Sequence, residues 1–287
     1  MHFMKKIELL VCAHKKDEST RNGGVYRAIQ VGKALHPELN LGYTCDNEGE
    51  NISEKNPFWC EYTALYWGWK NQKDVEYSGL CHYRRYFDIN ITEDNIDQLF
   101  KKNDILVIKQ DSPMLSKRSR LKNLAWVTTS EDAILFLDTL LYMYPEYKQE
   151  IMDYFFNSRL SIPYSMFIAK KEIFDQFCEF IFPVFFEMEK KMKSHSYSRQ
   201  KRAMGYFGEY SLGLFILCKH LRYKKIPLKA YGDAATNISL KRKIKTFLLS
   251  MVWRFIDNMS KTPKEFTCPT AIKVGLKQDG ISLKAIK

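Results

Sequence analysis

The sequence lacks most of the short signatures by which an enzyme class is identified. Its 287 residues contain no GxxxxGK[ST] phosphate loop, no GxGxxG fingerprint, no HExxH pair and no GxSxG nucleophile elbow. The cysteines and histidines show no zinc-ligand spacing either, so no metal site is expected from them. These absences argue against P-loop enzymes, simple dinucleotide-binding enzymes, zinc proteases and serine hydrolases.

The chain also lacks the features of a secreted or membrane-spanning protein. Its seven cysteines are odd in number, form no CxxC pair, and several lie in apolar stretches, as Cys12, Cys81 and Cys218 do. The N-terminus has no signal-peptide pattern, and no uncharged apolar stretch reaches about 18 residues. We expect a cytoplasmic protein with reduced thiols and no spanning helix.

Acidic residues are scarce at one end of the chain. The net charge is +12, and residues 241–287 hold eleven Lys/Arg against three Asp/Glu. A tail this basic suggests an anionic partner such as a membrane surface, a nucleic acid or an acidic glycan; a solvated tail is the alternative. Nucleic acid is disfavoured, because the basic charge is not interleaved with aromatic strands.

The first 110 residues alternate between strand and helix patterns, which predicts an α/β fold with a mostly parallel sheet. The expected strands are 6–13, 40–45, 77–87 and 104–109, with helices over 25–35 and 56–71. The residues from His14 to Asp17 follow the first strand, at the sheet edge where ligands of open α/β sheets bind. Further on, helices are expected at 130–142, 145–157, 170–193 (interrupted near Pro183) and 205–220, and strands at 163–169 and 223–228.

Two polar segments could bind an anion. The helix predicted from Asn56 is preceded by Asn51, Ser53 and Lys55, and free N–H groups at a helix start favour a diphosphate. An ordinary capped helix is the alternative. The second segment runs from His82 to Arg85 at the end of a predicted strand. The planar guanidinium groups of Arg84 and Arg85 could bind a phosphate through two hydrogen bonds. Ion pairs with local acids such as Asp88 are the alternative.

Three sequence blocks resemble a known bacterial family. They are NISxxNP at residues 51–57, CExTALYWGWKN at 60–71 and GLCHYRRYF at 79–87. Together they are similar to the family of capsular and exopolysaccharide glycosyltransferases long catalogued as a domain of unknown function, some members of which are galactofuranosyltransferases. The resemblance is dense over about residues 5–90, looser to about 225 and absent from the tail.

The resemblance implies a GT-A-like, Rossmann-type nucleotide-sugar-binding domain over residues 1–240 with helical additions, followed by a basic tail over 241–287. It implies transfer of a hexose such as galactofuranose from a UDP-sugar to a glycan or lipid-linked glycan. Donor-binding residues would be His14, Asn51, Ser53, Asn56, His82, Arg84 and Arg85. The chain has no Asp-x-Asp motif for a divalent metal, so metal dependence stays open. It also departs from the family pattern at Ser165-Met166 and at Glu209-Tyr210-Ser211, so donor or acceptor preference is expected to differ.

An inverting transfer needs a carboxylate base. Glu209 matches the acidic position of the family's later helix, with Asp46 as the alternative acid, and a structural role for Glu209 stays open. Two other functional classes compete with the enzyme: a non-catalytic nucleic-acid-binding protein and a glycan-binding scaffold without turnover.

The tail contains a helical stripe of apolar residues. Ile244, Phe247, Leu248, Met251, Val252, Phe255 and Ile256 recur at helical spacing, and Lys241, Arg242, Lys243 and Lys245 stand at the start. Such a basic amphipathic helix over 241–257 predicts peripheral attachment to the inner face of the plasma membrane. Packing of the stripe on the catalytic domain as a last core helix is the alternative.

Overall fold

The structure is a computed structural model that describes residues 5–109, 120–158, 160–192, 199–235, 240–258, 263 and 265–287. The chain divides into two compact units, each made of separate segments. The first unit holds residues 1–110, 162–180 and 220–237, and the second holds 111–161, 181–219 and 238–287. Residues 241–287, expected as a separate tail, therefore cluster with the second unit.

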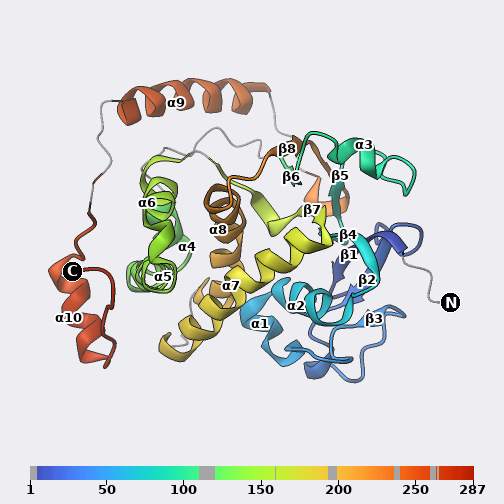
Figure 1. Ribbon diagram of the computed structural model, residues 1–287, viewed down its shortest axis with the longest axis horizontal. Coiled ribbons are helices and arrows are strands. Elements are labelled where there is room, and N and C mark those ends of the chain that lie inside the picture. Colours follow the sequence, from blue (N-terminus) through green and yellow to red (C-terminus); the bar gives the residue numbers. More distant parts are fainter. Residues whose placement is uncertain are drawn as a thin grey trace. The chain divides into compact units, whose positions relative to one another are not determined.

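The first unit is built on a mixed, mostly parallel sheet with the strand order β3-β2-β1-β4-β7-β6-β8 (Figure 1). Parallel pairing joins β1 (Lys5–Ala13), β2 (Tyr26–Gln30), β3 (Thr44–Cys45) and β4 (Val75–His82). The antiparallel strand β7 (Phe167–Lys170) joins β4 to β6 (Ile105–Ile108), which pairs in parallel with β8 (Tyr223–Ile226). The short strands β5 (Arg85–Phe87) and β9 (Leu228–Ala230) extend from β4.

The apolar run of the first predicted strand explains why β1 lies at the centre of this sheet. Seven of its nine residues are buried, as expected for a strand with neighbours on both edges and cover on both faces. The helix predicted over 25–35 is wrong. Tyr26–Gln30 forms β2 along β1, and only a 3-10 turn, η1 (Lys33–Leu35), follows. Pairing with a central strand has overridden a weak local helix preference.

The predicted helix over 56–71 begins at Asn56 but is interrupted. The 3-10 turn η2 (Ser53–Lys55) leads into α1 (Asn56–Trp59), and α2 (Tyr62–Asn71) follows after Cys60. Cys60 has a φ of 54°, which ends α1 after one turn. The first unit also contains α3 (Ile96–Phe100), η5 (Pro163–Ser165) and η7 (Gly232–Ala234).

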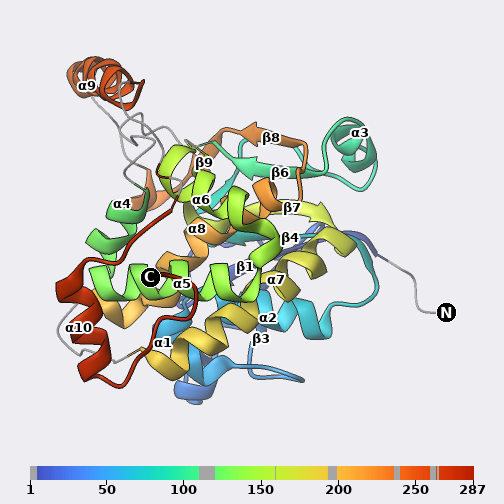
Figure 2. The same cartoon turned by 60° about the vertical axis from the view of Figure 1, so that its left-hand side comes forward.

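The second unit is helical. It contains α4 (Arg120–Val127), α5 (Ser130–Met143), η4 (Pro145–Tyr147), α6 (Lys148–Asn157), η6 (Arg199–Arg202), α8 (Ala203–Cys218), α9 (Leu240–Asn258) and α10 (Thr270–Gln278) (Figure 2). The helix α7 (Lys171–Lys191) begins in the first unit and ends in the second, with Pro183 inside it rather than at a break. Twelve of the sixteen α8 residues are buried, so α8 forms the core of this unit. No helix in the described ranges is long and apolar enough to cross a membrane.

Candidate functional site

The carboxyl ends of β1 and β4 form a topological switch point. From β1 the sheet continues to β2 and β3 on one side and to β4 on the other, and ligands of open α/β sheets bind where the order reverses in this way. Cys12 of β1 is the register partner of His82 of β4, and the Tyr83 N–H donates to the Cys12 carbonyl at 3.1 Å. His14 directly follows β1, and its ring contacts that of Tyr83 with centroids 5.2 Å apart.

The strand predicted to run to Phe87 ends at His82. Tyr83 and Arg84 form a two-residue turn, and the chain returns as β5 with His82 opposite Arg85. The expectation of one continuous strand from residue 77 to residue 87 is therefore wrong. The tight turn instead places Arg84 at the tip of a hairpin and makes Arg85 the cross-strand partner of His82.

Arg84 is paired with two carboxylates of the first unit. Its Nε lies 2.7 Å from Asp17 Oδ2, and its Nη1 lies 2.7 Å from Asp233 Oδ2. Hydrogen bonds from Ser19, together with the bond and charge of Arg84, lower the pKa of Asp17 below its usual value. The ion pairs raise the pKa of Arg84. Pairing with local acids, the alternative interpretation, thus describes Arg84, although the acids are Asp17 and Asp233 rather than Asp88.

Arg85 has a different environment. Its guanidinium lies 4.3 Å from the centroid of the Tyr164 ring, and its Nε is buried without a hydrogen-bond partner. None of the ion pairs found in the described part of the chain includes Arg85. A buried N–H of a permanently charged guanidinium group needs a hydrogen-bond acceptor, and phosphate oxygens are suitable acceptors.

The backbone beside Arg85 is strained. Tyr164 and Ser165 are consecutive non-glycine residues with φ values of 64° and 51°. The Tyr164 carbonyl lies 2.8 Å from His82 Nε2, and Ser165 Oγ accepts a hydrogen bond from Tyr62 at 3.0 Å. Left-handed conformations cost about 1–2 kcal/mol per residue and cluster at functional sites.

Arg21 is a candidate that sequence reasoning missed. It lies in the loop after β1, and its guanidinium donates to the hydroxyls of Tyr26 and Tyr231 at 3.0 and 3.1 Å. It also lies 4.4 Å from the Tyr86 ring centroid, and it lowers the pKa of Tyr231. The sequence feature that could have indicated Arg21 is its place in the loop after a buried strand, in a chain with 17 tyrosines that could surround its guanidinium.

The loop at 46–56 is built by its own polar side chains. Asp46 is fully buried and accepts hydrogen bonds from the backbone N–H groups of Gly32 and Lys33 at 2.9 and 3.1 Å and from the Ser53 hydroxyl. These contacts give Asp46 the role of a structural carboxylate at the start of η1. They also engage the hydroxyl of Ser53, which is itself fully buried.

The two asparagines of the loop are engaged in the same way. Asn51 binds the carbonyls of Asn47 and Gly49, whereas the Asn56 amide donates to the Cys60 carbonyl and the Thr63 hydroxyl. The expected helix-start anion site also has only the four-residue α1 behind it. We therefore assign Asn51, Ser53 and Asn56 a role in shaping the loop.

Glu209 belongs to a cluster in the second unit. It lies on α8 and is half-buried. Burial raises the pKa values of Tyr154 and Tyr210, the charge of Arg120 lowers both, and the charge of Glu209 adds a smaller increase to both. Arg120 is 1% exposed, donates from Nε to the Ser158 carbonyl at 2.9 Å, and lies 5.0 Å from the Tyr154 ring centroid. A carboxylate, a cation and two phenols thus lie near one another on α4, α6 and α8.

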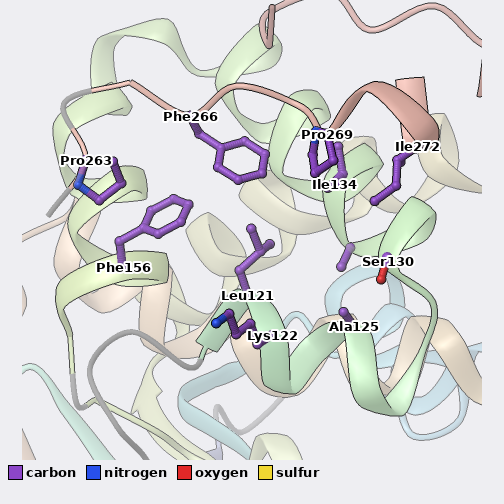
Figure 3. A pocket seen from close by; sticks show the side chains of 11 residues that line it. Leu121, Lys122, Ala125, Ser130, Ile134, Phe156, Pro263, Phe266, Pro269 and Ile272 are labelled. Carbon is purple, nitrogen blue, oxygen red and sulfur yellow. The ribbon is translucent and has the colours of Figure 1, made fainter. Parts of the chain in front are cut away.

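A separate apolar pocket of about 460 Å³ lies in the second unit. The rings of Phe156 and Phe266, with centroids 5.5 Å apart, line it together with Pro269 and Ile272 (Figure 3). Among the described residues that line this pocket, Lys122 is the one with a titratable side chain. Within the described ranges, no three His, Cys, Asp or Glu side chains are grouped as a metal site would need.

The sheet and its switch point define an α/β protein with a mostly parallel central sheet. The chain belongs to the family described as Domain of unknown function (DUF4422), whose model matches residues 8–220. Membership of a family catalogued as a domain of unknown function is thereby confirmed, and the three blocks and the capsular activity stay predictions. The fold is similar to that of the bifunctional glycosyltransferase WbbM in its apo form, with a TM-score of 0.71 and 24% identity.

That similarity covers 82% of this chain and 47% of the WbbM chain, so this chain spans about half the length of that protein. No curated protein sequence matches the chain.

Proposed function

We propose that this protein is a glycosyltransferase that uses a nucleotide-sugar donor, with Arg85 as the cation that meets the donor's diphosphate. The observation that carries the proposal is the guanidinium of Arg85 at the switch point, stacked on Tyr164 and with its buried Nε unpartnered. Departure of a diphosphate develops negative charge, which a fixed cation in a partly desolvated site stabilises. The fold shared with WbbM supports the same reaction class.

His82 is proposed to orient this site. Its Nε2 is bonded to the Tyr164 carbonyl, which links the hairpin to the strained residues over which Arg85 stacks. His14, in ring contact with Tyr83, and Arg21, held by three tyrosines, are proposed to line the donor's path along the same sheet edge. UDP is the nucleotide that the family resemblance favours.

For the chemical step we propose Glu209 as the base. In an inverting transfer the acceptor hydroxyl oxygen forms a bond to the anomeric carbon, the bond to the diphosphate oxygen breaks, and the carboxylate takes the hydroxyl proton. Asp46 is a poorer candidate because its oxygens accept two backbone N–H groups and a serine hydroxyl in the core. The acceptor class that we propose is a glycan or lipid-linked glycan of bacterial surface polysaccharide.

The test is donor binding by three arginine variants of the full chain, measured by calorimetry with UDP and UDP-hexoses, with and without Mn²⁺. Loss of a hydrogen-bonded charge pair costs about 1.5–3 kcal/mol, so Arg85→Ala should weaken binding about 10- to 100-fold. Arg84→Ala should weaken binding less, because Asp17 and Asp233 already hold Arg84.

Arg222→Ala is the matched control, because Arg222 pairs with Asp104 in the same unit, beside the start of β8 and away from the hairpin. Equal donor affinity in the Arg85 and Arg222 variants would refute the assignment. Release of UDP from a UDP-sugar, faster with a glycan acceptor, separates an enzyme from a glycan-binding scaffold.

A further inference from the structure

The helix α9 presents an exposed apolar face. Seven of the thirteen large hydrophobic residues that are exposed in the described part of the chain lie on this one helix. Their exposed fractions range from 53% to 73%, and they are Leu240, Ile244, Phe247, Leu248, Met251, Val252 and Phe255. Packing on the rest of the protein, the alternative interpretation of this stripe, would have buried them, as it buries most of α8.

The face is continuous along the helix. At about 100° per residue the seven positions fall within an arc of about 140°, which is the width of one side of an amphipathic helix. Nineteen residues make a helix about 28 Å long, so the exposed face runs along almost all of it. A contiguous apolar surface of this kind indicates a binding surface.

The charge beside this face is positive. Lys241 and Lys245 are exposed and lie at one border of the apolar arc, and the first turn of α9 contains no acidic residue. Positive charge at the N-terminal end of a helix opposes the helix dipole, so an external negative charge would offset this cost. Lysines beside an apolar face fit an anionic lipid surface, where the stems lie along the acyl region and the ammonium groups reach the headgroups.

We propose that α9 binds the surface of an anionic lipid bilayer, lying in the interface with its apolar face inserted. An anionic lipid surface matches both the apolar face and the lysines that border it. A second protein copy would match the apolar face but not the bordering lysines, and a soluble polyanion would match only the lysines. The inference is independent of the proposed glycosyl transfer and holds for any activity of the first unit.

The experiment is co-sedimentation of the full chain with vesicles of phosphatidylcholine, with and without phosphatidylglycerol. Truncation is unsuitable, because the N–H groups of Lys284, Ala285 and Ile286 bind the buried Asp138 carboxylate. Phe247→Glu with Phe255→Glu should abolish sedimentation with anionic vesicles. Val274→Glu on α10, where Val274 is 50% exposed, is the matched control and should sediment as the unchanged protein does.

Lys241→Ala with Lys245→Ala tests the electrostatic part. Each lysine near an anionic surface contributes about 1 kcal/mol, so the pair should lower the partition coefficient about 30-fold, with a smaller loss at high salt. Three outcomes would overturn the proposal: undiminished sedimentation of the Phe247/Phe255 variant, equal loss in the Val274 variant, or a dimer in gel filtration that the Phe247/Phe255 variant converts to monomer.

Discussion

Adjacent arginines of the β4–β5 hairpin have different partners. Arg84 pairs with Asp17 and Asp233, which lie 67 and 149 residues away in the sequence. Arg85 stacks on Tyr164 and pairs with no carboxylate in the part of the chain that the structure describes. From the sequence, the two arginines could either bind an anion or form ion pairs with nearby acids. The sequence could not show that Arg84 forms the ion pairs and Arg85 does not, because the acids that pair with Arg84 come from remote loops.

The Asp17–Arg84 pair predicts a pH dependence of stability. The pKa of Asp17 is lowered in the folded protein, so its ionised form stabilises the fold above the unfolded pKa near 3.8. This contribution is lost as pH falls through the still lower folded pKa. Asp17→Asn should therefore reduce the free energy of unfolding at pH 7, and the difference from the unchanged protein should shrink towards pH 2.

Urea unfolding at a series of pH values measures this difference, with Asp88→Asn at an exposed position of the same hairpin region as the control. A difference that is constant between pH 7 and pH 2 would show that Asp17 does not act through its charge.

Glu209 gives a prediction about chemistry rather than stability. A positioned base contributes about 10²- to 10⁴-fold, so Glu209→Gln should lower the turnover number by at least about 100-fold while donor affinity stays unchanged. Asp46→Asn is the comparison, because it disturbs a buried carboxylate and should act mainly by lowering the melting temperature. Near-normal turnover of the Glu209 variant would remove Glu209 from the mechanism.

At the scale of elements, long apolar patterns predicted structure better than short ones. The strand over 6–13 and the helices over 130–142 and 205–220 are present as β1, α5 and α8 within a few residues. The expectations that failed include the helix over 25–35, the strand predicted to run to Phe87 and the uninterrupted helix over 56–71. Pairing with β1, the turn after His82 and the positive φ of Cys60 decide these structures, and no local sequence pattern indicates them.

Gly79 in the third block is required by strand packing. A Cβ built there would lie 2.2 Å from the Phe167 carbonyl oxygen and 3.0 Å from the Ile168 Cα, both backbone atoms of the paired strand β7. Neither atom can move without breaking the β4–β7 ladder. Gly79→Ala should therefore lower the free energy of unfolding by about 3 kcal/mol, at the upper end of overpacking costs.

Gly275 on α10 is the opposite case and serves as the control. A Cβ at this position meets no atom within 4 Å, so Gly275→Ala should gain up to about 1 kcal/mol from helix propensity alone. Chemical denaturation of the two variants beside the unchanged protein measures both effects. A Gly79 variant as stable as the Gly275 variant would mean that β4 and β7 are not packed this closely.

At the scale of the whole molecule, the chain divides into two compact units that each combine segments distant in the sequence. Its two units each consist of three segments, and residues 238–287 cluster with the helical unit. The sequence predicted a division at residue 240, because composition and charge change there. It could not show that the chain leaves the first unit and returns to it twice, since each return is made by short strands such as β7 and β8.

The backbone of the C-terminal residues is bound by a buried carboxylate of the second unit. Asp138 of α5 is 1% exposed, and its oxygens accept the backbone N–H groups of Lys284, Ala285 and Ile286 at 2.7–3.0 Å. Three successive N–H groups around one anion form a nest, and each bond to a charged acceptor is stronger than a neutral one. The carboxylate of Asp138 therefore fixes the position of residues 284–286. A solvated basic tail would have no such contact.

Asp138→Ala leaves these N–H groups without their acceptor and should lower the free energy of unfolding by about 2–3 kcal/mol. Asp138→Asn retains one acceptor oxygen and the side-chain size. Its free energy of unfolding should therefore lie between those of Asp138→Ala and the unchanged protein. Carboxypeptidase digestion reports the local effect, because release of residues 284–286 exposes the chain end to the enzyme. If Asp138→Ala changed neither the unfolding free energy nor the digestion rate, the C-terminal segment would have to be held by other contacts, such as the Cys268 N–H to Lys287 carbonyl bond of 3.0 Å.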